Sequence, residues 1–503
     1  MKLFLNICLI LLTHLSFSQK EADCIAFGRC YNDCEAPTSN GLIYFNENSV
    51  DSIVSKKLNL DLFFCSASFK NNNVHYISNG WLIVNSLGDT IDSKIVLPEF
   101  VSEGEQGTLT SLQNPLFLSI ISGDSTAIYL FYGQYKWIFT GSLDAFDTHF
   151  SYARLNALSM DKEVALLSKN NVLLSGVDST SRGNIKACRH ANGRDWWVIK
   201  PSIYTNKFYR GLLGPSGIEM KPFYTSVSQQ TQNSDCWDHF NYAGTKFYHF
   251  NALIEKKLYV YEFDRCTGEL SNPIIHDLSA WFSVYDYNAN CISEDGTKLY
   301  IYRSPDPLLP DQPGGLLQYD LNTLSMTYLG DYSYPTLTPN SKWVVTSSYT
   351  DLTGQGEPIP RMDVIYFPNQ AGLNCQYQPN QYNLVNRHSF EFSPSYANFR
   401  LGPIDGSSCD TLGLNTIQDP ENSIEVKIYP NPTEGPITVE IKNIKSEKIE
   451  LKLFNALGQA VYNRQLTNTI ETLNDINVRP GLYILQLINS DGLMITSNKL
   501  IIK

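Results

Sequence analysis

A polar turn followed by an alternating apolar run recurs along most of this chain. The clearest copy is residues 293–302, in which an Asp-Gly turn precedes Leu-Tyr-Ile-Tyr. A glycine-containing turn that leads into β-branched and aromatic residues predicts the inner hairpin of a small antiparallel sheet. The matching turn positions are Gly193, Gly244, Gly296 and Ser341, so the spacings are 51, 52 and 45 residues. Periods of this length are typical of β-propeller blades.

A second pattern and several weaker copies extend the repeat. Residues 261–267 and 317–323 lie 56 residues apart and fit the next strand of each blade. Weaker turn-and-strand copies begin near residues 71, 124 and 160. The last of these lies only about thirty residues before the first clear turn, so it fits either a new blade or the second hairpin of a blade.

These patterns predict an all-β chain with two domains. We expect a β-propeller of six to eight blades, seven preferred, over residues 36–412, closed into a ring because an open array would leave an apolar edge at each end. After a polar linker at residues 413–423, residues 424–503 contain about seven short alternating strands, which indicates a small Ig-like β-sandwich. Aromatic residues make up 12% and charged residues 17% of the chain, a balance that favours many short strands.

The first eighteen residues have the order of a secretory signal peptide. Lys2 precedes a mostly apolar stretch from residue 3 to residue 15, and Ser16-Phe17-Ser18 supplies small residues for cleavage. About a dozen apolar residues are too few to span a bilayer, which takes roughly 20. We therefore expect cleavage after residue 18, no transmembrane anchor, and a Cys-rich N-terminal segment at residues 19–35.

Ten of the 11 cysteines remain once Cys8 is removed with the signal peptide. An even number in an exported chain favours disulfide bonds, and one pairing hypothesis joins Cys375 to Cys409. The cysteines that crowd the mature N-terminus are Cys24, Cys30 and Cys34. They form no CxxC pair and have no histidine nearby, so we expect no zinc site. Neither another metal nor a cofactor is expected.

The charge is distributed unevenly between the two domains. The whole chain carries a net charge of −12. From Ile424 onward there are nine basic and eight acidic residues, whereas the preceding part has 29 and 42, so the body carries −13 and the tail +1. An acidic body repels phosphate and gains nothing from counterion release, which excludes nucleic acid as a partner.

The most suggestive polar residues for a site are His190, Asp195, Asp235, Asp238 and His239. Acidic residues beside tryptophans would suit a sugar-binding or glycosidic site. In repeated turns, however, aspartate commonly accepts bonds from turn amides, and aromatic residues fill the space between blades. The chain has no G-x-S-x-G, P-loop, H-E-x-x-H or EF-hand motif. We therefore treat these five as candidate ligand-binding residues and assign no catalytic residue.

Two segments of the propeller region have a distinctive sequence. One is Lys-Ala-Cys-Arg-His-Ala-Asn-Gly-Arg-Asp-Trp-Trp at residues 186–197, and the other covers residues 398–406 and 409–412. Both resemble segments that recur in secreted propeller-like proteins of the Bacteroidetes. The resemblance covers scattered parts of residues 40–412, and it implies architecture without a shared activity.

Four short motifs mark the tail: Y-P-N-P-x-x-G, F-N-x-x-G, G-x-Y and a terminal K-x-x-x-K. The residues in question are Tyr429, Pro430, Asn431, Pro432, Gly435, Gly458, Gly481, Tyr483, Lys499 and Lys503. The whole tail closely resembles the type A C-terminal sorting domain of the type IX secretion system; a generic Ig-like adhesion module is the other interpretation. The resemblance implies Sec export to the periplasm, then passage across the outer membrane with the tail as address and the type IX machinery as partner.

These features together indicate a secreted or outer-surface β-propeller protein exported by type IX secretion. Its expected role is binding, with a polysaccharide or a protein as ligand. The alternative is a secreted carbohydrate-active enzyme, a glycosidase or a lyase, on a propeller scaffold. Turnover of a polysaccharide, as opposed to binding alone, would separate the two.

Overall fold

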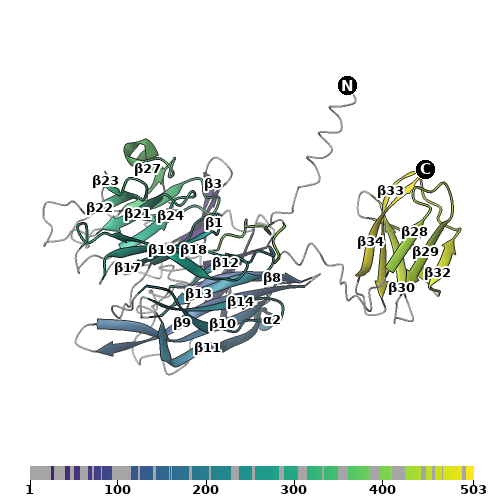
Figure 1. Ribbon diagram of the computed structural model, residues 1–503, viewed down its shortest axis with the longest axis horizontal. Helices are drawn as coiled ribbons and strands as arrows, with labels where there is room; N and C mark the ends of the chain where they lie inside the picture. The colour runs from purple at the N-terminus through teal and green to yellow at the C-terminus, as the bar shows by residue number, and fades with distance from the viewer. Residues whose placement is uncertain are drawn as a thin grey trace. The chain divides into compact units, whose positions relative to one another are not determined.

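The structure is a computed structural model, and it contains two compact units, Met1–Asp410 and Thr411–Lys503 (Figure 1). Each unit is described by itself. The residues described are 24–27, 40–45, 50–56, 66–70, 73–80, 82–92, 115–122, 125–139, 143–157, 159, 161–180, 184–202, 206–227, 237–251, 255–282, 288–303, 314–330, 333–348, 361–383, 397–404, 406–409, 425–442, 449–455, 459–466, 468–489 and 494–503.

The described strands of the first unit form seven antiparallel sheets, each made of consecutive strands. The first three sheets are β1 (Cys24–Phe27), β2 (Asn40–Phe45) and β3 (Val50–Lys56); β4 (Ser66–Lys70), β5 (Asn73–Ser78), β6 (Ile83–Asn85) and β7 (Thr90–Asp92); and β8 (Leu116–Ser122), β9 (Ser125–Phe139), β10 (Leu143–Asn156) and β11 (Leu166–Thr180). A short helix, α2 (Lys162–Ala165), precedes β11.

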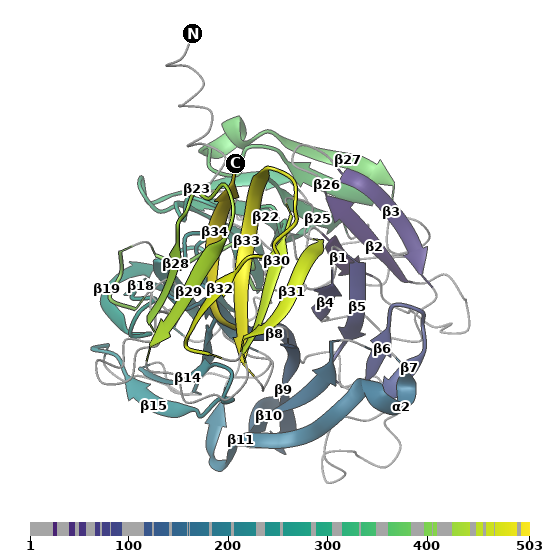
Figure 2. The ribbon, with the colours of Figure 1, turned by 90° about the vertical axis from the view of Figure 1, so that its right-hand side faces the viewer.

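The other four sheets have four strands each. They are β12 (Lys186–Arg189), β13 (Trp196–Pro201), β14 (Lys207–Leu213) and β15 (Lys221–Tyr224); β16 (Trp237–Phe240), β17 (Lys246–Asn251), β18 (Lys257–Phe263) and β19 (Leu270–Asp277); β20 (Asn288–Ile292), β21 (Lys298–Arg303), β22 (Gly315–Asp320) and β23 (Ser325–Gly330); and β24 (Ser333–Leu337), β25 (Val344–Ser348), β26 (Arg361–Ile365) and β27 (Tyr377–Asn383), with a 3-10 turn at η3 (Gly372–Cys375). In Figure 2 the sheets follow one another around a common centre, as the blades of a β-propeller do.

The repeated turns join the first strand of a blade to the second. In each turn the residue at the predicted position donates its N–H to the carbonyl of the residue three positions earlier. Gly296, for example, donates to the Ser293 carbonyl at 2.9 Å. All four predicted positions have a positive φ, between 61° at Ser341 and 73° at Gly296. Glycine adopts this conformation without a steric cost, which explains why the turn is so recognisable in the sequence.

Two details of the repeat differ from the expectation. The copy near residue 160 does not begin a blade, because it forms α2 and the start of β11, the outer strand of the third sheet. The first sheet has no such copy, and its strand β1 lies inside the segment expected to precede the propeller. Twelve residues separate β1 from β2, which is a longer connection than the turns described above.

Apolar side chains connect each sheet to the next around the ring. The contact between the last sheet and the first is made by Ile43 and Phe45 of β2, which pack in one core with Trp343, Val345 and Met362. Within the described strands, no hydrogen-bonded pairing joins these two sheets. The first and last blades therefore meet through side chains.

The second unit is a β-sandwich. One sheet contains β28 (Glu425–Tyr429), β29 (Ile437–Lys442) and β32 (Ile470–Leu473), and the other contains β31 (Ala460–Leu466), β30 (Ile449–Phe454), β33 (Gly481–Asn489) and β34 (Met494–Ile502), in these spatial orders. Alternation along β30 buries Ile449, Leu451 and Leu453. Their core draws on both sheets, as expected for the Ig-like sandwich.

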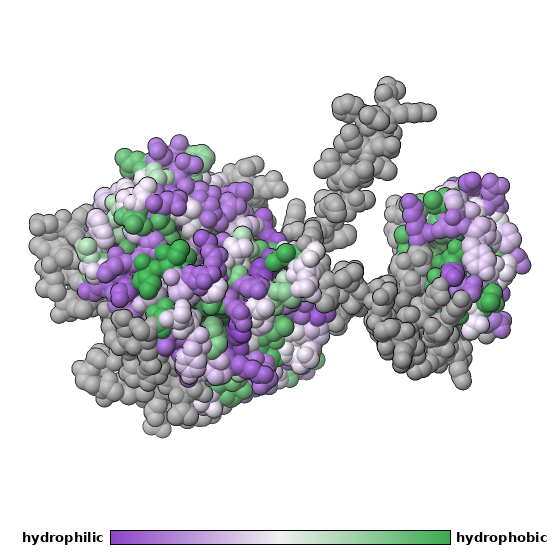
Figure 3. All heavy atoms as spheres, in the orientation of Figure 1, coloured by the Kyte–Doolittle hydropathy of each residue, from purple (hydrophilic) through white to green (hydrophobic). Residues whose placement is uncertain are grey.

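The visible face of the larger unit mixes hydrophobic with hydrophilic residues (Figure 3). The exposed apolar residues of the larger unit include Ile274 and Ile275 on the outer strand β19, and exposed apolar residues are common on protein surfaces. In the described part of the chain, no helix is both long enough and apolar enough to cross a membrane.

Candidate functional site

The two segments with the Bacteroidetes resemblance pack against each other. We call residues 397–404 and 406–409 the strap, because they run over the inner turns of the fourth and fifth sheets. The Ile404 N–H donates to the Ala191 carbonyl at 2.9 Å. The Asn398 amide donates to the Tyr242 carbonyl at 2.8 Å. Two parts of the chain about two hundred residues apart thus form one structural element.

Close packing explains why both segments have a distinctive composition. A Cβ atom on Gly193 would lie 2.7 Å from Pro403 of the strap, so only glycine fits there. The Phe399 ring packs edge-on against Trp196 with centroids 5.0 Å apart. The Arg189 guanidinium lies 3.9 Å over the Trp196 ring, a cation–π arrangement. The motif residues therefore hold the strap in place.

A disulfide between Cys266 and Cys409 ties the end of the strap to the fifth sheet. The pairing hypothesis of Cys375 with Cys409 is therefore wrong. Cys375 is a free, buried thiol, as are Cys188 and Cys291, and burial raises the pKa of Cys188 to about 12. Spacing alone could not find the true pair, because its members lie 143 residues apart.

His190 and Asp195 are held by their own turn. The His190 ring accepts the Asn192 N–H at Nδ1 (3.0 Å) and has its Nε2 3.1 Å from the Cys266 carbonyl, which assigns the proton to Nε2. The Asp195 carboxylate accepts from Arg194 at 2.7 and 3.1 Å and from Asn192 at 2.8 Å. The Asp195 carboxylate therefore stabilises its own turn, and His190 links this turn to the Cys266 carbonyl of the fifth sheet.

Asp238 and His239 lie next to each other on β16 but in different surroundings. Asp238 is fully buried, and its Oδ1 lies 2.8 Å from His249 Nδ1. Its other oxygen, Oδ2, is buried without a hydrogen-bond partner. His239 likewise has a buried Nε2 without a partner. Asp235, the remaining candidate, lies outside the described residues.

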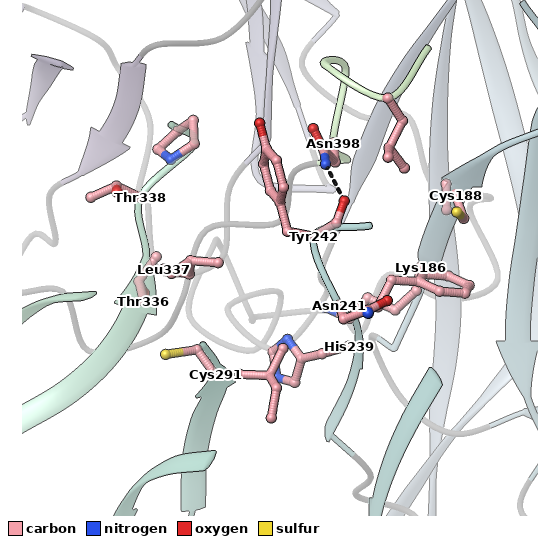
Figure 4. Close-up of a pocket in the computed structure, with 15 residues that line it drawn as sticks. Lys186, Cys188, His239, Asn241, Tyr242, Cys291, Thr336, Leu337, Thr338 and Asn398 are labelled. Atoms are coloured by element: carbon pink, nitrogen blue, oxygen red, sulfur yellow. Dashed lines mark hydrogen bonds between the residues drawn. The ribbon is translucent and has the colours of Figure 1, made fainter. Parts of the chain in front are cut away.

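A cavity of about 110 Å³ lies among the innermost strands of the fourth to seventh sheets (Figure 4). We call it the axial cavity. Its lining comes from four inner strands, from the turns that follow two of them, and from the strap. The lining residues that matter below are Lys186, Cys188, His239, Tyr242, Cys291 and Leu401. Of the predicted site residues, only His239 is among them.

Burial shifts the pKa values of two side chains that line this cavity, Lys186 and His239. It lowers the pKa of Lys186 to about 8, although attraction to Asp238 acts in the opposite direction. Burial, followed by repulsion from Lys186, lowers the pKa of His239 to about 3. At neutral pH the lysine is therefore mainly charged and the histidine is neutral. Lys186 could not be recognised as a site residue from the sequence, because a single lysine before an apolar run forms no motif.

The sorting motif of the tail forms a clamp on the last strand. The Asn431 side chain donates to the Lys499 carbonyl at 2.6 Å and accepts the Ile501 N–H at 3.0 Å. The buried Thr433 continues the contact, since its N–H donates to the Ile501 carbonyl and its carbonyl accepts the Lys503 N–H. This short parallel contact covers part of the outer edge of β34, which would otherwise present unpaired backbone groups.

The other motif residues have varied positions. Tyr483 is buried, and its hydroxyl donates to the Arg479 carbonyl at 2.6 Å. Gly481 begins β33, and Gly458 lies outside the described residues. The exposed motif residues are Tyr429, Pro430, Asn431, Pro432, Gly435, Gly481, Lys499 and Lys503. A partner that recognises the tail would therefore meet these residues first.

Asn431→Ala should free the end of β34. The Ile501 amide loses its acceptor, and a hydrogen bond of this kind contributes about 1 kcal/mol, so its hydrogen exchange should accelerate about fivefold in the full chain. Asn463→Ala is the matched control, because Asn463 bonds only to the exposed Glu450 side chain at 2.8 Å. Equal exchange at Ile501 in both variants would refute the clamp.

The comparison with known protein families supports the interpretation of the tail as a sorting domain. Residues 427–503 match the protein family described as the secretion system C-terminal sorting domain. The fold and this tail define an exported β-propeller protein. More specifically, the tail is a type IX sorting domain, and it marks the chain as a secreted or cell-surface protein.

Three further similarities are partial or distant. The chain is 33% identical over 91 residues to an ulvan lyase from Nonlabens ulvanivorans, a match that covers 18% of this chain and 17% of that enzyme. Among solved structures, the periplasmic gluconolactonase PpgL of Pseudomonas aeruginosa matches at 12% identity and a TM-score of 0.40, covering 74% of this chain and 98% of PpgL. PorZ, a surface component of the type IX system of Porphyromonas gingivalis, matches at 10% identity and a TM-score of 0.26, covering 93% and 63%. The two structural similarities are too low to support a functional conclusion.

Proposed function

We propose that this chain is a type IX cargo whose propeller is a binding module for a polysaccharide or protein ligand. A signal peptide at residues 1–18 delivers it to the periplasm, and the sorting domain that begins near residue 424 delivers it across the outer membrane. Because β1 pairs with β2, we place the start of the propeller at or before Cys24, inside the expected N-terminal segment.

The observation that carries this proposal is that both described candidate carboxylates, Asp195 and Asp238, are already bound to neighbouring side chains. A glycosidase needs two carboxyl groups that flank the scissile bond. Asp195 is held by Arg194 and Asn192, and Asp238 is fully buried against His249. Neither geometry presents a carboxyl group to a sugar.

The tryptophans near these residues serve the fold as well. The Trp196 indole N–H donates to the Ser119 carbonyl, and the Trp197 indole N–H donates to the Arg265 carbonyl, each at 2.9 Å. Trp196 is fully buried. A sugar-binding tryptophan presents a ring face to the ligand, and Trp196 has no such face available.

A polysaccharide panel tests the proposal with the mature protein. We expect binding to at least one polymer without release of reducing ends or unsaturated products, since neither of the two described candidate carboxylates, Asp195 and Asp238, is free to act as acid or base. Asp195→Asn and Asp238→Asn should change the melting temperature more than they change binding. Asp51→Asn is the control, because Asp51 is exposed and makes one long contact to Ser52. Turnover that disappears in Asp195→Asn or Asp238→Asn, but not in Asp51→Asn, would overturn the proposal.

A carbohydrate-active enzyme is the second candidate. The observation that favours it is the partial identity to an ulvan lyase, which covers about a sixth of either chain. The same panel decides between the two candidates, because only the enzyme releases products.

A further inference from the structure

The axial cavity contains a cation without a partner. Lys186 belongs to its lining. Among the described residues, its ammonium group makes no hydrogen bond and has no carboxylate within 4.0 Å. Asp238 attracts it from a greater distance, but the one bond described for that carboxylate goes to His249. Lys186 is partly buried, and a charge in a confined, partly desolvated space is stabilised when a group of opposite charge binds beside it.

A second polar group of the cavity is also unsatisfied. His239 lies on β16 and its Nε2 is buried without a partner, whereas most buried side-chain polar atoms are hydrogen-bonded. A neutral imidazole can donate from one nitrogen and accept at the other. The cavity thus pairs a positive charge with a free hydrogen-bonding nitrogen, and Figure 4 shows both residues among those that line it.

The rest of the lining limits what can bind. Leu337 and Leu401 are apolar, and Cys188 and Cys291 are thiols whose pKa is raised by burial, so they remain neutral. The volume of about 110 Å³ is somewhat smaller than the roughly 150 Å³ of an engineered cavity that holds benzene. A compact molecule with a small apolar part therefore fits, and a polymer does not.

We propose that the axial cavity binds a small oxyanion, the carboxylate or phosphate of a compact molecule, with Lys186 as its counter-charge and His239 as a hydrogen-bonding partner. The inference rests on the proposed binding function, and it names the ligand chemistry of one site in the propeller. The strap closes part of this site through Leu401 and Asn398, so the disulfide that holds the strap also shapes the cavity.

Thermal unfolding of the mature full-length protein tests this site with sodium acetate and sodium phosphate as probes. Sodium chloride at equal ionic strength is the reference. A ligand that binds only the folded state raises the melting temperature. We expect at least one probe to raise it in the wild type, with acetate and phosphate distinguishing a carboxylate from a phosphate site.

Two variants separate the site from general salt effects. Lys186→Met should abolish the shift, with at least a tenfold loss of affinity by calorimetry, and should fold, because the ammonium group makes no described hydrogen bond or ion pair that the substitution would break. Lys246→Met is the control, since Lys246 is partly exposed and lies 3.7 Å from Glu262; it should keep the shift. An equal shift in wild type and Lys186→Met would overturn the proposal.

The pH dependence with acetate gives an independent check. The titratable groups that face Lys186 or share its cavity are Asp238, His239, Cys188, Cys291 and Tyr242. Because Lys186 loses its proton above about pH 8, acetate affinity should fall by up to tenfold per pH unit from there, while acetate keeps its charge. Constant affinity from pH 7 to 9.5 would refute the role of Lys186. Absence of any anion shift together with intact polysaccharide binding would overturn this site and leave the proposed function standing.

Discussion

Cys409→Ser should lower the free energy of unfolding of the propeller by about 2–5 kcal/mol, the range typical for loss of a native disulfide. The bond joins residues 143 positions apart, so it removes a large amount of chain entropy from the unfolded state. It also anchors the strap, whose Phe399 and Leu401 pack into the propeller cores. Urea denaturation of the mature oxidised protein measures the effect.

The control for this prediction is Ser408→Ala. Ser408 is exposed and adjacent to the disulfide, so its removal should change stability by no more than about 0.5 kcal/mol. The double variant Cys266→Ser with Cys409→Ser should match Cys409→Ser alone, because both remove the same bond. If Cys409→Ser and Ser408→Ala were equally stable, the strap would not be held by this disulfide.

The repeated turns made most of the propeller predictable from the sequence. Gly193, Gly244 and Gly296 need a positive φ, and that local requirement is written directly in the residue type. The sandwich was predictable for a similar reason, since alternation along β30 and β33 sets the buried face. Local conformation and periodicity thus suffice for elements that repeat.

Features that depend on distant residues were not predictable. The strand β1 has four residues and gains its place only by pairing with β2. The strap contacts turns about two hundred residues earlier, and its composition showed the importance of the segment but not its location. The partner of Cys409 had no signal, because many pairings of ten cysteines are compatible with one sequence.

The candidate site shows the same limit. Asp195 was singled out because it precedes two tryptophans, yet the turn itself uses the carboxylate. Lys186 and Cys291 line one cavity although they are about a hundred residues apart. Each blade contributes only a short segment to this cavity, so the cavity leaves no contiguous motif in the sequence.

Deletion of residues 424–503 should leave the propeller transition almost unchanged. The sandwich core consists of residues between 426 and 502, and the cores of the first unit consist of residues between 42 and 401. Units with separate cores unfold separately to a first approximation. Calorimetry of the mature protein with and without the tail should show the propeller transition shifted by less than about 2 °C, equivalent to under 1 kcal/mol. A larger loss would mean that the tail is part of the propeller fold.

The central claim is that the tail is an export address separate from the binding module, and the distribution of protein between periplasm and cell exterior tests it most directly. In a strain with an intact type IX system, the full chain should reach the medium or the cell surface, whereas the chain without residues 424–503 should remain in the periplasm. The same tail placed behind a signal peptide and an unrelated reporter should carry the reporter out. Arrival of the tail-less chain at the surface or in the medium, in amounts equal to the full chain, would contradict the account.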